Sequence, residues 1–280
     1  MSSWAFRFSG ERVTVKGAGR TDAGVHAVAQ VAHLRLARYL EPAALGRFTD
    51  AVNQQLPGGI HLLAVEPAHP RFHARHDAAA RSYVYQLARR RTAFAKRYVW
   101  WVKEPLDVAR LRQAAERVPG RHDFRLFCQS PAEQASTLVE VERLEVAEDG
   151  ELVLLRITAS HFLWRMVRRL VGALVQVGTG QLSLAELDQL IAGTPLPEGR
   201  GEPGQWTAPA SGLFLARVLY PGDPPLPPLE AITPVPRFAP VVPTGPVRDE
   251  RPPTTRPPAR KPPPAHPGRP RKEAPRRRER

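Results

Sequence analysis

The chain has 280 residues, of which 42% are hydrophobic, and it carries a formal net charge of +14, so it combines enough apolar residues for a core with an affinity for polyanions. Its single cysteine, Cys128, excludes an intrachain disulfide framework and is expected to be an inert core thiol. The longest uncharged run, 170–185, is too short and too polar for a membrane span, and the N-terminus has no apolar signal segment, so we expect a cytoplasmic protein with no membrane partner.

Apolar residues that alternate with polar ones predict strands at seven places along the chain. The predicted strands span 12–16, 28–36, 60–65, 82–87, 137–146, 152–158 and 212–219. Apolar residues at helical spacing predict four helices. The first spans Pro42 to Leu56 and the second begins near Asp107. The third covers 161–177, and the fourth runs from Ser183 to Gly193. Ser183 and Glu186 have the spacing of a capping box, which marks the start of the last helix.

Together, the strands and helices predict an α+β fold. Several strands follow one another too closely for the crossover that a parallel pair needs, so we expect mixed, mostly antiparallel sheets. We expect two α+β halves, 1–104 and 105–220, whose sheets form one continuous sheet around a central basic cleft. The boundary between them is placed near Pro105.

The last 60 residues have a different composition, with 20 of the 31 prolines and 13 Lys and Arg against 6 Asp and Glu. Because proline fixes φ and removes a donor, 221–280 is expected to be a disordered, Pro/Arg-rich basic tail. This tail is either a solvated appendage without a specific role or a source of added non-specific affinity for RNA. Residues 1–220 carry 28 basic and 21 acidic side chains, so a polyanionic partner also suits the folded part.

The densest local signal is the glycine-rich segment 17–26, which lies between the first two predicted strands. Its three glycines permit a sharp turn and a close approach of a ligand, and Asp22 stands in that turn with Arg20 two residues before it. Taken alone, Asp22 reads as a turn residue bonded to nearby backbone. The segment lacks the Gly-Lys-Ser/Thr ending of a P-loop and is followed by a strand, so no nucleotide cofactor is predicted.

Residues 19–26 read Gly-Arg-Thr-Asp-Ala-Gly-Val-His, which resembles the catalytic motif of the tRNA pseudouridine synthase A family. Further blocks match that family in order and spacing. They are Asn-Gln-Gln-Leu-Pro at 53–57, Phe-His-Ala-Arg at 72–75, Ala-Arg-Ser-Tyr-Val-Tyr at 80–85, Gly-Arg-His-Asp-Phe at 120–124, Met-Val-Arg-Arg-Leu-Val-Gly at 166–172 and Ala-Ser-Gly-Leu-Phe-Leu at 210–215. The resemblance covers roughly 11–220.

The resemblance implies a cofactor-independent isomerase that converts uridine to pseudouridine at positions 38, 39 and 40 of the tRNA anticodon arm. It implies that Asp22 is the nucleophile and that Tyr83 stacks on the target uracil. Arg168 is the implied partner of the aspartate, and Arg20 is the arginine implicated in displacing the flipped nucleotide. A homodimer is implied as well, so that one tRNA contacts both subunits.

The chemistry of this reaction agrees with those roles. A carboxylate that attacks C1′ of the sugar or C6 of the ring holds one fragment covalently while the uracil turns, without any cofactor. The nucleotide must leave its stack first, so an aromatic face such as Tyr83 is needed. Arg168 within about 4–6 Å of Asp22 would favour the charged carboxylate.

Other interpretations exist for the same side chains. Without the resemblance, Tyr83 on an alternating strand reads as a core aromatic, and Arg168 on an apolar helix as a solvated residue or a buried ion pair. His73 and His76 have no carboxylate or cysteine cluster at ligand spacing, so no metal site is predicted.

Members of the family carry a further strand, a Gly-Trp-Gln type loop and a helix before the part that matches, and this chain begins after them. We expect an exposed sheet edge where that strand is absent. Because the loop lies near the bound RNA in the family, the alternative to an active isomerase is a catalytically inactive, truncated RNA-binding remnant.

Overall fold

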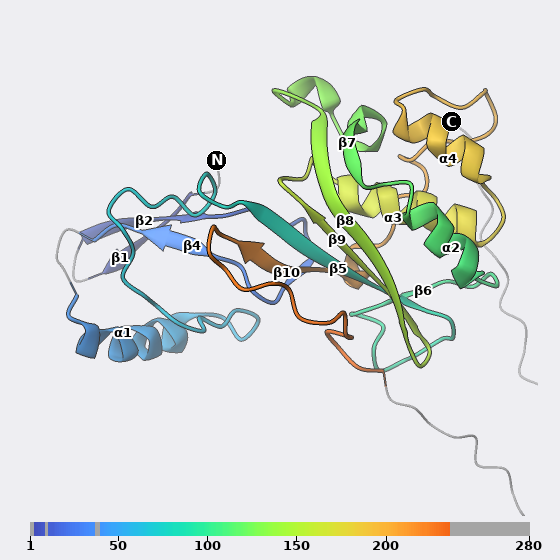
Figure 1. Ribbon diagram of the computed structural model, residues 1–280. Coiled ribbons are helices and arrows are strands. Elements are labelled where there is room, and N and C mark those ends of the chain that lie inside the picture. Colours follow the sequence, from blue (N-terminus) through green and yellow to red (C-terminus); the bar gives the residue numbers. More distant parts are fainter. Residues whose placement is uncertain (1–2, 9–10, 37–39, 236–280) are drawn as a thin grey trace, which may run out of the picture. The chain divides into compact units, whose positions relative to one another are not determined.

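The computed structural model describes residues 3–8, 11–36 and 40–235 (Figure 1). A three-stranded sheet has the order β1 (Ser3–Phe8), β2 (Glu11–Gly17) and β4 (Ala32–Leu34). A seven-stranded sheet runs β3 (His26–Ala27), β10 (Leu213–Leu219), β5 (Ala80–Ala88), β9 (Leu152–Ala159), β8 (Leu138–Asp149) and β7 (Gly120–Asp123), with β6 (Trp100–Trp101) paired to β5. The α-helices are α1 (Pro42–Gln55), α2 (Val108–Ala115), α3 (Met166–Gly178) and α4 (Leu184–Ile191).

The predicted α+β class is confirmed, with one difference in how the strands are arranged. Every strand pair is antiparallel except β3 with β10 and β5 with β6. The described strands form two sheets and not one continuous sheet, because 18–25 leaves β2 as an irregular loop before the chain rejoins the larger sheet at β3. The boundary near Pro105 stays a prediction. No helix among the described residues has the length and apolarity to cross a bilayer.

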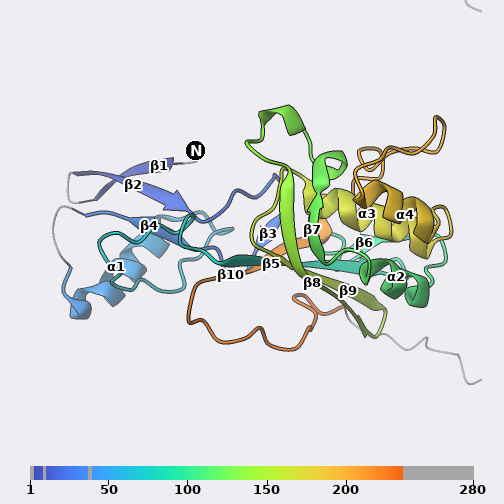
Figure 2. The ribbon, with the colours of Figure 1, turned by 45° about the horizontal axis from the view of Figure 1, so that its top comes forward.

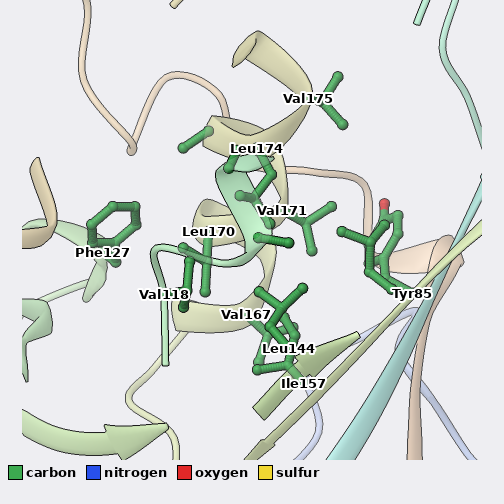
Figure 3. Close-up of a cluster of buried hydrophobic side chains, with 14 of the residues drawn as sticks. Tyr85, Val118, Phe127, Leu144, Ile157, Val167, Leu170, Val171, Leu174 and Val175 are labelled. Carbon is green, nitrogen blue, oxygen red and sulfur yellow. The ribbon is translucent and has the colours of Figure 1, made fainter. Parts of the chain in front are cut away.

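Helix α3 packs along one face of the larger sheet and forms most of its core. Val167, Leu170, Val171 and Leu174 are at most 5% exposed, and Figure 3 shows this part of the helix beside Tyr85 of β5 and Ile157 of β9. Helix α2 packs against both α3 and β8 (Figure 2). Burial of each Leu or Val side chain contributes roughly 1.5–3 kcal/mol to the free energy of folding. Helix α3 is therefore held firmly against the sheet that contains β5, the strand that carries Tyr83.

The other face of β5 and β9 is covered by the chain that follows β10. Leu229, Ala231 and Val235 pack against the cluster that contains Leu152 and Leu154. Every residue of β9 is therefore buried, including the polar residues Arg156 and Thr158.

Polar contacts fix the same segment. Arg156 donates to the Pro227 carbonyl oxygen at 2.5 Å, and the Gln86 side chain accepts from the Thr233 N–H at 3.1 Å. Although proline removes backbone donors, these carbonyl and amide groups still find partners on the sheet. These contacts lie beyond Pro221, where the predicted tail begins; 236–280 lies outside the described residues.

One predicted strand is wrong and two elements are shorter than predicted. Residues 60–65 form no strand, because the Asn53 side chain takes the place of a neighbouring strand by bonding both the N–H and the carbonyl oxygen of Leu62. The strand predicted over 28–36 is reduced to the three residues of β4. The helix predicted from 161 begins only at Met166, because Arg165 has a left-handed φ of 61°.

Candidate active site

The glycine-rich segment between β2 and β3 is tied down at its start. The Ala18 N–H donates to the Val31 carbonyl oxygen at 2.8 Å, and the Gln30 side chain donates to the Gly19 carbonyl oxygen at 3.1 Å. Arg81 of β5 donates to the Ala18 carbonyl oxygen at 3.3 Å. The start of the loop is therefore fixed by hydrogen bonds to the chain before β4 and to β5 of the larger sheet.

Asp22 opens a tight turn in this loop. The Val25 N–H donates to the Asp22 carbonyl oxygen at 3.1 Å, and Gly24 has a φ of +81°. A Cβ at Gly24 would lie 3.3 Å from the Cβ of Ala210, so both the backbone conformation and the close packing require glycine. This turn explains the glycine that follows the aspartate in the sequence motif.

The Asp22 carboxylate faces the start of α3. Its Oδ1 accepts a hydrogen bond from Trp164 Nε1 at 3.2 Å, and its Oδ2 lies 3.3 Å from an Arg168 guanidinium nitrogen. Arg165 Nε lies 4.0 Å from the same Oδ2. Two arginines and the N-terminal end of a 13-residue helix thus place positive charge beside one carboxylate, an arrangement that favours an anion there.

The Arg168 side chain is fixed by the segment around Ala208, in addition to its contact with Asp22. Its side chain is 14% exposed, and its Nε donates to the Ala208 carbonyl oxygen at 2.7 Å. The segment around Ala208 approaches α3 closely because residue 172 is glycine: a Cβ there would lie 1.7 Å from the Trp206 carbonyl oxygen. Gly172 and Ala208 therefore fix the direction in which Arg168 points.

Tyr83 lies on the central strand β5 and meets Phe162 edge to face, with ring centroids 5.1 Å apart and an interplanar angle of 88°. Burial raises the pKa of the Tyr83 hydroxyl to about 12; the negative charge of Asp22 acts in the same direction, and Arg81 opposes it. The hydroxyl therefore stays protonated at neutral pH. The effect of Asp22 on Tyr83 reflects their proximity, which brings an aromatic ring and a carboxylate into one site.

The chain is similar to proteins of known family. A family model described as tRNA pseudouridine synthase matches residues 114–221. Proteins called tRNA pseudouridine synthase A from Brucella ovis, Brucella abortus and Brucella melitensis are each 38% identical over 219 residues, covering 76% of this chain and 84% of each relative. The chain belongs to the tRNA pseudouridine synthase A family. Pseudouridine synthases are isomerases, so the predicted family and enzyme class are confirmed.

Within this tRNA pseudouridine synthase fold, the predicted site residues divide into two groups. Asp22, Arg168 and Tyr83 come together, although 146 positions separate Asp22 from Arg168. Arg20 is exposed and makes no ion pair or hydrogen bond with any residue that the structure describes. Trp164, which contacts the carboxylate directly, was not among the predicted site residues. Its place four positions before Arg168, just ahead of α3, was the signal that it lies nearby.

The histidines considered for a metal site form a cluster of rings elsewhere in the fold. The ring centroids of His33 and His73 are 4.6 Å apart, and those of His73 and His76 are 4.2 Å apart. Burial, followed by the positive charge of His73, lowers the pKa of His33, and the His33 Nδ1 accepts from the Ala74 N–H. Across residues 3–8, 11–36 and 40–235, no three His, Cys, Asp or Glu side chains are grouped to hold a metal ion.

Proposed function

We propose that this chain isomerises uridine to pseudouridine at positions 38, 39 and 40 of the tRNA anticodon arm, with Asp22 as the nucleophile. The observation that carries the proposal is the ion pair between Asp22 and Arg168 at 3.3 Å, and the charge of the same carboxylate also acts on the Tyr83 hydroxyl. A fixed carboxylate next to an aromatic side chain is what nucleophilic attack on a flipped pyrimidine nucleotide needs. The family to which the chain belongs supports the substrate, because its relatives are named as tRNA enzymes.

The reaction rearranges one nucleotide without adding or removing atoms overall. The Asp22 carboxylate attacks either C1′ of the ribose or C6 of the uracil, and the glycosidic bond between C1′ and N1 breaks. The uracil turns, a bond forms between C1′ and C5, and the carboxylate is released. C5 gives up its hydrogen to solvent and N1 gains one, so neither an oxidant nor a metal takes part.

Access to the target requires the nucleotide to leave its stack. In our proposal the ring of Tyr83 stacks on the flipped uracil, replacing part of the lost base stacking, which is worth about 1–3 kcal/mol per base. Arg20, which is exposed and unpaired within the described part of the chain, fills the gap in the RNA or contacts its phosphates. Arg168 keeps the Asp22 carboxylate aimed while these movements occur.

We further propose that the enzyme acts in the cytoplasm as a homodimer, as the family resemblance implies, so that one tRNA contacts both subunits. Light scattering after size exclusion gives the mass of the protein alone and with tRNA. A monomeric protein that turns over tRNA normally would contradict the dimer and leave the chemistry intact.

The test of the chemistry is tritium release from tRNA labelled at uridine C5, measured for the 280-residue chain and for Asp22→Ala. Release by the parent protein and none by the variant, with tRNA affinity within a few-fold, is the expected result. Normal turnover by Asp22→Ala would remove Asp22 from the mechanism. A folded parent protein that binds tRNA but releases no tritium would instead support the inactive RNA-binding alternative.

A further inference from the structure

We propose that Trp164 is a positioning residue for the nucleophile, in that its indole N–H fixes the second oxygen of the Asp22 carboxylate. The inference rests on the proposed role of Asp22. The contact joins Trp164 Nε1 and Asp22 Oδ1 at 3.2 Å, whereas Arg168 binds Oδ2 at 3.3 Å. Each carboxylate oxygen therefore has its own donor.

Two separate donors restrict the carboxylate more than one donor does. The terminal torsion of an aspartate is broad and roughly two-fold, so a single ion pair leaves the plane of the carboxylate free to turn. With Trp164 on Oδ1 and Arg168 on Oδ2, a turn in either direction breaks at least one of the two bonds. The remaining lone pairs then point in a constant direction, which a near-attack geometry requires.

Both the backbone and the ring of Trp164 contact neighbouring residues. The Trp164 carbonyl oxygen accepts from the Gln129 N–H at 2.9 Å, and the guanidinium of Arg165 lies 5.8 Å from the centroid of the indole ring. Arg165 has a φ of 61°, which is uncommon for a non-glycine residue and reverses the chain between Trp164 and the first residue of α3. This turn brings Trp164 back toward Asp22.

The exposure of Trp164 argues against a role in the core. The side chain is among the large hydrophobic residues that remain exposed, at 41%, while the core beneath it is filled by Leu163 and Met166, which are 6% and 0% exposed. A tryptophan whose only purpose was packing would be expected to bury its ring more fully. Its polar atom reaches the carboxylate instead.

The test removes the N–H and keeps the ring. Benzothienylalanine, which has sulfur in place of the indole nitrogen, is introduced at position 164, with Trp164→Phe as a simpler second variant. Because a hydrogen bond to a charged group is stronger than one between neutral groups, we expect its loss to lower kcat about 10-fold in this partly exposed site. KM and tRNA affinity should stay within about two-fold, since the contact is to the enzyme's own carboxylate.

Trp101 provides the matched control. It lies in β6 under the guanidinium of Arg91, 5.7 Å from its ring centroid, so it has a similar cation–π contact away from Asp22. The same sulfur analogue at position 101 should leave kcat at the parent value. An unchanged kcat for the analogue at 164, or a loss confined to KM and tRNA affinity, would overturn the inference and make Trp164 an RNA-stacking residue.

Asp22→Asn, assayed in parallel, separates this inference from the proposed function. If Asp22→Asn retains turnover, the proposed nucleophile is wrong whatever Trp164 does. If Asp22→Asn is inactive and the analogue at 164 turns over like the parent protein, only the role of Trp164 fails.

Discussion

Arg168 and Ala208 are bonded to each other twice. The Arg168 side chain donates Nε to the Ala208 carbonyl oxygen at 2.7 Å, and the Ala208 N–H donates to the Arg168 carbonyl oxygen at 3.0 Å. The guanidinium is therefore clamped on one edge, and its outer nitrogen faces Asp22. A planar fork with several donors can do both tasks at once, whereas a lysine ammonium is a single point charge.

Arg168→Lys should therefore lower kcat even though it keeps the positive charge. A lysine cannot bond the Ala208 carbonyl oxygen and aim at Asp22 with the same geometry, and we expect about a 10- to 100-fold loss of kcat with tRNA affinity within a few-fold. Single-turnover kinetics and filter binding measure the two quantities. Arg117→Lys, in an exposed ion pair with Asp188 at 2.7 Å, is the control and should change neither. Parent-like turnover by Arg168→Lys would show that charge alone suffices.

Tyr83 should act through its ring and not through its hydroxyl. Tyr83→Phe keeps the stacking face, so kcat/KM should stay within about three-fold, whereas Tyr83→Leu should lose about 10- to 100-fold. Because the pKa of the hydroxyl is raised to about 12, the group does not titrate between pH 6 and 9, and the pH–rate profiles of Tyr83→Phe and the parent should have the same shape in that range. A basic limb below pH 9 that is present in the profile of the parent and absent from that of Tyr83→Phe would contradict this prediction.

Acid should destabilise the protein through His33. Its pKa in the folded state lies below the usual 6.5, so below about pH 6.5 the unfolded state binds more protons and the free energy of unfolding falls as the pH is lowered. Protonation of His33 Nδ1 also ends its bond from the Ala74 N–H, which lies 3.0 Å away. In urea unfolding at pH 5 and pH 7, His33→Gln should lose part of this dependence. His61→Gln, at an exposed position, should keep all of it.

Two truncations should separate the structured part of the C-terminal region from its charge. Deleting 236–280 removes 13 Lys and Arg against 4 Asp and Glu, so tRNA binding at low salt should weaken and its salt dependence should become shallower, while Tm stays unchanged. Deleting 224–280 also removes the partners of Arg156 and Gln86, so Tm should fall by several degrees. Site choice on tRNA should be the same in both. An equal Tm for the two truncations would mean that 224–235 adds no stability.

Most long elements with a clear period were predictable, but the six-residue strand β1 was missed, as were the shorter strands β3, β6 and β7. Alternation located β5, β8, β9 and β10, and the capping-box spacing at Ser183 located the start of α4. The structure contains both hydrogen bonds of that capping box. Strands β3 and β6 have two residues each, too few for any period to appear. The false strand over 60–65 failed because a side chain, that of Asn53, satisfies the backbone there, and no period reports such a contact.

The candidate site shows the same limit. The motif resemblance singled out Asp22, Arg168 and Tyr83, but only the folded chain brings them together. The contact from Trp164 depends on the left-handed turn at Arg165. Such a conformation is usually predicted from a glycine, and the residue at 165 is an arginine. The role of Arg20 stays a proposal; its side chain is exposed and forms no ion pair or hydrogen bond with another described residue.

Gly172 is a position at which a small substitution should disturb the site without changing any of its charged groups. The Trp206 carbonyl oxygen occupies the place where a methyl group at 172 would stand, and Ala208 follows two residues later. A single added carbon would push that segment outward and loosen the clamp on Arg168. In a saturation-mutagenesis screen, alanine at this position should therefore score among the inactive variants, although glycine has no side chain that could take part in the chemistry.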